Sequence, residues 1–101
     1  MEEKIKVMIV DDNVEFVKLL TMFVDSQKDM EVVGSLNDGS AVVTKIKEWK
    51  PDVLLLDIIM PERDGLAVLE DLDESALEKR PNIVVMSAIG QEKMVMKLNW
   101  V

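Results

Sequence analysis

The segment Val53–Asp57, with the sequence VLLLD, is a short apolar run that ends in a carboxylate. A continuous apolar run of this length is typical of a strand that is covered on both faces of its sheet. A second run, Ile5–Val10 (IKVMIV), ends in the same way, because Asp11 and Asp12 follow it directly. If these strands are parallel neighbours, their carboxyl ends share one edge of the sheet, so we expect the three acidic side chains to converge there.

The rest of the chain alternates strand signals with helix signals. Such alternation predicts right-handed crossovers and an α/β fold with a doubly wound parallel sheet, in which ligands bind outside the carboxyl ends of the strands. We expect strands at residues 5–10, 31–35, 53–56 and 83–86, and a fourth helix beginning within residues 91–99. The apolar spacing predicts these inward-facing helix residues: Phe16, Val17, Leu20, Phe23 and Val24, then Val42, Val43, Ile46 and Trp49, then Leu66, Leu69 and Leu72.

Length and composition limit the possible functions. The 101 residues predict a single domain over 1–101, and the formal charge of −8 argues against a nucleic-acid surface on it. The chain contains no histidine, which excludes the Ser-His-Asp triad and the usual zinc sites. It also contains no cysteine, and none of its apolar runs has the length of a membrane span, so we expect a cytoplasmic protein.

Three converging carboxylates need a cation, because left alone they would repel one another by several kcal/mol in a partly dry site. Oxygen-only ligands suit a hard ion, so the residues favour Mg²⁺. A simpler interpretation stays open for each acid. Asp57 can be a polar residue that marks the end of a strand, and Asp11 and Asp12 can form a turn and helix cap before Asn13. The two interpretations are compatible, since one acid can cap while another binds metal.

The ordered set of motifs resembles the response-regulator receiver domains of two-component signalling. The resemblance rests on the acidic pair Asp11 and Asp12, the segment 57–61 (DIIMP), the later Asp64-Gly65, and Ser87 followed by Ala88. It covers roughly residues 4–92 and implies a flavodoxin-like fold with strand order 2-1-3-4-5. The segments 57–61, 64–70 and 90–92 resemble more narrowly the receiver of the sporulation master regulator of endospore-forming bacteria.

The resemblance implies a role for each motif residue. Asp57 would be the phosphoacceptor, taking a phosphoryl group from the phosphohistidine of a histidine kinase or phosphotransferase. Asp12 would bind Mg²⁺ directly and Asp11 through water, and the backbone carbonyl of Ile59 would be a further ligand. The Ser87 hydroxyl would contact the transferred phosphoryl group, although a serine at a strand end is also an ordinary turn residue. The receiver would control a downstream transcriptional output and would not itself be an enzyme.

The end of the chain departs from the family pattern. Receivers continue through a fifth strand with a Lys-Pro pair and a fifth helix, whereas this sequence contains no Lys-Pro and ends at Val101. We therefore expect a receiver that is incomplete at its C-terminus, with strand order 2-1-3-4. Residues 83–86 would then form an exposed sheet edge, and long apolar edges invite pairing. The expectation is a homodimer or larger oligomer through strand four and the tail 94–101, which could also cover that surface within its own molecule.

Two other functions compete with a working receiver. A receiver remnant that no longer switches could act as a dimerisation module, and the missing Lys-Pro strand favours this function over that of a fully working receiver. A metal-dependent phosphatase with an aspartyl nucleophile is the enzyme alternative. Such enzymes usually carry a second acid two residues after the nucleophile, and here that position is Ile59, which counts against it.

Overall fold

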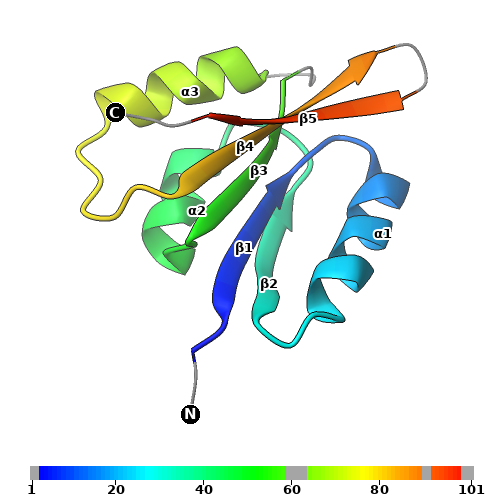
Figure 1. Ribbon diagram of the computed structural model, residues 1–101. Helices are drawn as coiled ribbons and strands as arrows, with labels where there is room; N and C mark the ends of the chain where they lie inside the picture. Colours follow the sequence, from blue (N-terminus) through cyan, green and yellow to red (C-terminus); the bar gives the residue numbers. More distant parts are fainter. Residues whose placement is uncertain (1–2, 59–63, 90–91, 99–101) are drawn as a thin grey trace.

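The computed structural model describes residues 3–58, 64–89 and 92–98, and their backbone forms one sheet with helices on both faces (Figure 1). Strands and helices alternate along the chain as far as β4, and β5 then follows without an intervening helix. The elements are β1 (Ile5–Val10), α1 (Val14–Asp25), β2 (Met30–Leu36), α2 (Val42–Trp49), β3 (Val53–Asp57), α3 (Gly65–Glu74), β4 (Asn82–Ile89) and β5 (Glu92–Leu98). Within these described ranges, none of the helices is long and apolar enough to cross a membrane.

The sheet has the order β2-β1-β3-β4-β5. Its first four strands are parallel, which confirms the predicted doubly wound sheet with strand order 2-1-3-4. The strand at the end is different, because β5 pairs antiparallel with β4. The β1–β3 register aligns Val10 with Leu56, so the residues that follow both strands lie at the same edge of the sheet.

The structure corrects the expectation for the C-terminal segment. Residues 92–98 form a strand and not the beginning of a fourth helix, and they pair with β4 along its length. Only residues 90 and 91 separate the two strands, a connection suited to a hairpin and far too short for the crossover that a parallel strand needs. Strand four is therefore not a sheet edge, because β5 covers it within the same molecule. This is one of the two arrangements that we expected.

Two apolar clusters hold the layers together. On one face of the sheet, Leu54 and Leu56 of β3 pack with α2 and α3, through residues such as Ile46 and Leu72. On the other face, α1 packs against β1, and Leu55 of β3 borders that cluster. Figure 1 shows α1 on one side of the sheet and α2 with α3 on the other. The apolar run of β3 is thus explained, because its alternate side chains enter both clusters.

The prediction of an inward-facing side chain is wrong for two residues, Phe23 and Leu66. Phe23 is 62% exposed and Leu66 is 60% exposed, whereas Val68, which the pattern did not select, is fully buried. Because α3 begins at Gly65, its inward stripe runs through positions 65, 68 and 72, and Leu66 lies about 100° away from position 65 around the helix. The inward stripe of α1 includes Val17 and Val24, and Phe23 falls on its flank.

Asp52 joins the amino ends of three strands at the edge of the sheet opposite the acidic residues. Its backbone N–H donates to the Lys6 carbonyl (2.8 Å), and its own carbonyl accepts from the Asn82 N–H (2.9 Å). Its carboxylate accepts from the Lys6 backbone N–H (2.8 Å) and from the Lys79 ammonium (2.5 Å). The hydrogen bond from Lys6 and then that from Lys79 hold the pKa of Asp52 below its ordinary value.

This hydrogen bonding predicts a pH-dependent contribution to stability. A depressed folded-state pKa means that the stabilisation is complete above the unfolded pKa of about 3.9 and is lost as the pH falls through the folded value. Because the Asp52 side chain is 37% exposed, we expect Asp52→Asn to lower the free energy of unfolding by only about 0.5–1 kcal/mol at pH 7. Urea denaturation between pH 7 and pH 2.5 measures this, and the difference from wild type should shrink below pH 4. Glu70→Gln, at an exposed site on α3, is the control; a pH-independent difference for Asp52→Asn would contradict the prediction.

Candidate functional site

The turn between β1 and α1 positions the first acid. The Asp11 backbone N–H donates to the Leu36 carbonyl (3.0 Å), which ties the residue to the end of β2. Its Oδ1 accepts from the Asn13 N–H (2.8 Å), and the Asn13 side chain in turn accepts from the Phe16 N–H (3.0 Å) as the N-cap of α1. The predicted turn is therefore confirmed for this segment, but the cap is the side chain of Asn13 and neither of the two acids. The turn leaves Asp11 fully buried at the edge of the sheet, beside the exposed Asp12.

The end of β3 positions Asp57. This residue is the last of its strand, is 2% exposed and is paired in register with Met86 of β4. The next residue, Ile58, donates its N–H to the Met86 carbonyl (3.1 Å) and accepts from the Gly65 N–H (2.7 Å). Two neighbouring elements, β4 and the first turn of α3, thus fix the backbone on which the Asp57 carboxylate is carried.

The first turn of α3 approaches the backbone of Asp57 very closely. A Cβ atom added to Gly65 would lie 2.5 Å from the Asp57 carbonyl oxygen and 2.6 Å from the Ile58 Cα. Asp64 starts the helix, because its carboxylate accepts from the Ala67 N–H (3.0 Å). The Asp64-Gly65 pair is visible in the sequence as one of the motifs of the resemblance. The requirement for a residue without Cβ comes from a contact that sequence spacing does not reveal.

The three acids do meet. Asp11, Asp12 and Asp57 each offer a carboxylate oxygen, and these oxygens all lie within 4.8 Å of one another. Two of the residues are buried and Asp12 is exposed, so the cluster opens to solvent on one side. At this separation two ionised carboxylates repel by about 3 kcal/mol with an effective dielectric constant near 20. A hard cation that takes oxygen ligands and keeps several waters, as Mg²⁺ does, fits this donor set.

Two other predicted site residues have a more limited description. Ile59 lies outside the described residues. The backbone of Ser87 belongs to β4 and is paired with Met94 of β5, one position beyond the Met86 that faces Asp57. The expectation that the fourth strand ends at Ser87 is wrong, since β4 continues to Ile89 through its hairpin with β5. Ser87 therefore lies within a strand and not in a loop, one residue after Met86, which is the partner of Asp57 in the sheet.

Comparison with known proteins gives a consistent picture. The sequence model of the response regulator receiver domain matches residues 7–99. The response regulator domain of Thermotoga maritima CheB is 36% identical, with a TM-score of 0.77, and the match covers 89% of this chain and 65% of that one. The signal receiver domain of the putative response regulator NarL from Mycobacterium tuberculosis is 33% identical, with a TM-score of 0.76 and coverage of 87% and 69%.

A third similar structure is the CheX–CheY–BeF3–Mg²⁺ complex from Borrelia burgdorferi. It matches with 34% identity and a TM-score of 0.75, over 89% of this chain and 66% of that one. The chain thus spans 65%, 69% and 66% of the length of these three relatives.

Proposed function

Because this chain belongs to the response regulator receiver domain family, we propose that it is a phosphoacceptor switch in which Asp57 receives the phosphoryl group. One observation carries the proposal: the carboxylate oxygens of Asp11, Asp12 and Asp57 lie within 4.8 Å of one another at the carboxyl edge of the sheet. This is the edge at which doubly wound sheets bind their ligands. Asp57 ends β3, the central strand of the sheet, and the exposed Asp12 leaves the site accessible from solvent.

The proposed chemistry is a phosphoryl transfer from a phosphohistidine. An Asp57 carboxylate oxygen forms a bond to phosphorus while the bond between phosphorus and the donor's imidazole nitrogen breaks. The donor's other ring nitrogen carries a proton, and the nitrogen that loses phosphorus keeps the electron pair of the broken bond. The products are therefore an aspartyl phosphate and a neutral imidazole. Such transfers depend on positioning and charge neutralisation more than on covalent assistance. The rigid placement of Asp57 by β4 and α3 supplies the positioning.

Asp11, Asp12 and Asp57 are the residues that would hold Mg²⁺, with the Ile59 backbone carbonyl as a further proposed ligand. A bound divalent ion would neutralise charge on the carboxylates and on the phosphoryl oxygens. The Ser87 hydroxyl is proposed to contact a phosphoryl oxygen after transfer, since its position follows that of Met86 in the strand next to Asp57. The presence of Mg²⁺ in the complex of the similar Borrelia CheY supports the choice of metal.

The proposed partner is a histidine kinase or phosphotransferase that carries the phosphohistidine, and the proposed location is the cytoplasm. Residues 1–101 are proposed to form a single receiver domain, with a transcriptional output downstream. A role in sporulation rests on the sequence segments 57–61, 64–70 and 90–92 alone. Self-association is proposed through β5, which is the last strand of the described sheet in place of β4; light scattering over a micromolar concentration series tests it.

Binding of Mg²⁺ is the first test of the site. Carboxylates and water make a weak site, so millimolar Mg²⁺ should raise the thermal midpoint by mass action, equivalent to about 1 kcal/mol at a few times the dissociation constant. Differential scanning calorimetry with and without MgCl₂ measures the shift. Asp12→Ala should abolish the shift, because it removes a proposed metal ligand. Asp12 is exposed, so its removal should leave the fold intact. Asp29→Ala, at an exposed site before β2, is the matched control and should keep the shift. An equal Mg²⁺ response in Asp12→Ala would refute the metal assignment.

A further inference from the structure

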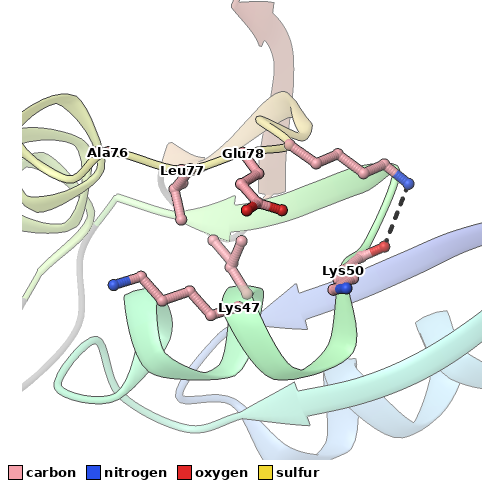
Figure 2. Close-up of a pocket in the computed structure, with 7 residues that line it drawn as sticks. Lys47, Lys50, Ala76, Leu77 and Glu78 are labelled. Atoms are coloured by element: carbon pink, nitrogen blue, oxygen red, sulfur yellow. Dashed lines mark hydrogen bonds between the residues drawn. The ribbon is translucent and has the colours of Figure 1, made fainter.

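A hollow lies away from the acidic edge, between α2 and the segment that joins α3 to β4 (Figure 2). Its volume is about 570 Å³, a size that accommodates a short peptide segment or a small molecule. In Figure 2, Leu77 and Glu78 extend from the joining segment toward α2, which carries Lys47 and is followed by Lys50. We call this hollow the lysine groove; it is lined by Ile46, Lys47, Lys50, Ala76, Leu77 and Lys79, together with Glu78.

The floor of the lysine groove is apolar and continuous with the core. Ile46 is 2% exposed and belongs to the larger core cluster, and the half-buried Leu77 packs against that cluster. Ala76 is exposed and adds a small apolar side chain to the lining. An apolar side chain from a ligand would therefore rest on atoms that the core already holds in place. Such a floor favours a ligand with a hydrophobic group over a simple inorganic ion.

One wall of the lysine groove is held in place by Lys79. Its ammonium group donates to the Asp52 carboxylate (2.5 Å) and to the Lys50 carbonyl at the end of α2 (3.4 Å). These contacts tie the joining segment to the amino end of β3 and to the helix terminus. The charge of Lys79 is thereby balanced by Asp52. Because these contacts lie within the chain itself, the groove is formed without a ligand.

Lys47 and Lys50 give the lysine groove its net positive charge. Neither Lys47 nor Lys50 has an ion-pair partner in the part of the chain that the structure describes. Glu78 places one carboxylate in the same lining, which leaves an excess of positive charge on the groove. The whole chain carries −8, so this local excess stands out from the surrounding surface. Carboxylates on a ligand would be attracted here and repelled from most other parts of the molecule.

We propose that the lysine groove binds an acidic segment of a partner protein. A leucine-like side chain of that segment would contact Ile46 and Leu77, and flanking carboxylates would pair with Lys47 and Lys50. The groove lies at the amino ends of the strands, because Lys79 pairs with Asp52 immediately before β3, whereas Asp57 ends that strand. The acidic segment and a phosphoryl donor can therefore bind at the same time, and the proposal does not depend on the function proposed for Asp57.

The test is a titration of the ¹⁵N-labelled protein with short capped peptides, followed by NMR. The probe Ac-EELLEE-NH2 should shift the amide signals of residues 46–50 and 76–79 and should bind more weakly as salt is raised. The peptides Ac-KKLLKK-NH2 and Ac-EESSEE-NH2 should bind at least about fivefold more weakly, because each lacks one of the two interactions. Equal binding of all three peptides would overturn the proposal. So would tighter binding of a single-stranded oligonucleotide at the same residues.

Charge-reversal variants locate the effect. Lys47→Glu combined with Lys50→Glu should weaken binding of Ac-EELLEE-NH2 about tenfold or more. Lys18→Glu combined with Lys28→Glu changes the net charge equally at exposed sites in and after α1, and should leave binding within about twofold. Ala76→Glu adds one negative charge to the lining without removing a lysine or a core contact, and should also weaken binding. Asp57→Asn should bind like wild type, which separates this result from the phosphoacceptor test. Equal losses in the two lysine pairs would contradict the groove as the site.

Discussion

Incubation with acetyl phosphate and Mg²⁺ is expected to add one phosphoryl group to the wild-type chain and none to Asp57→Asn. The amide is close in shape to the carboxylate, so the buried position at the end of β3 remains filled, but its oxygen is not a competent nucleophile. Intact-mass measurement over a time course gives the labelled fraction directly. Equal labelling of Asp57→Asn would refute the assignment of the acceptor.

Two further variants separate the acceptor from its surroundings. Asp12→Ala keeps the nucleophile but removes a proposed metal ligand, so labelling should slow by about 100-fold, the loss typical when one charge-stabilising group is removed. Asp29→Asn, at an exposed site before β2, should label like wild type.

The same experiment discriminates among the competing functions. A receiver accumulates a stoichiometric phosphoryl group that decays once the donor is removed. A phosphatase would consume acetyl phosphate over many turnovers, and inorganic phosphate release would then exceed the protein concentration many-fold. A remnant that has lost switching would remain unlabelled even when Mg²⁺ binds.

Gly65→Ala is expected to destabilise the protein by about 2–4 kcal/mol. The added Cβ would lie 2.5 Å from the Asp57 carbonyl oxygen and 2.6 Å from the Ile58 Cα. Both are backbone atoms, so the first turn of α3 or the end of β3 must move. The expected sign is the reverse of the usual one, because Gly→Ala in a helix normally stabilises by about 0.5–1 kcal/mol. The free energy of unfolding from urea denaturation measures the effect.

Gly34→Ala is the matched control for Gly65→Ala. Its added Cβ would lie 2.5 Å from the outer edge of the Trp49 ring, which belongs to a side chain that can rotate away. The expected loss is therefore smaller, about 1 kcal/mol. Gly65→Ala should also weaken the Mg²⁺-dependent thermal shift, because it displaces the backbone that carries Asp57, whereas Gly34→Ala should not. A Gly65→Ala protein as stable as wild type would show that the close approach imposes no constraint.

The sequence alone was sufficient for the parallel sheet and for the acidic edge. The apolar runs at Ile5–Val10 and Val53–Asp57 are long enough to identify strands, and parallel pairing brings the residues after them to one edge. The meeting of Asp11, Asp12 and Asp57 follows from that geometry, so it could be predicted without coordinates.

The C-terminal segment and the helix faces were decided by tertiary structure. Residues 92–98 carry apolar side chains that suit either a helix or a strand, and pairing with the free side of β4 selected the strand. Phe23 and Leu66 have apolar side chains near the inward stripes, but the exact rotation of each helix leaves them exposed. Periodicity identifies a helix reliably and its inward face only approximately, because one residue turns the helix by about 100°.

The strands and helices as far as β4, the buried central strand β3 and the acidic residues at the carboxyl ends of β1 and β3 were thus determined by local sequence. Contacts between distant segments decided the rest: the packing of Gly65 against Asp57, the hairpin that covers β4, and the groove walled by Lys79. The physical reason is that local propensity and periodicity act within one element. Close packing, strand pairing and charge pairing depend on atoms separated by many residues, as in the 27-residue separation between Asp52 and Lys79.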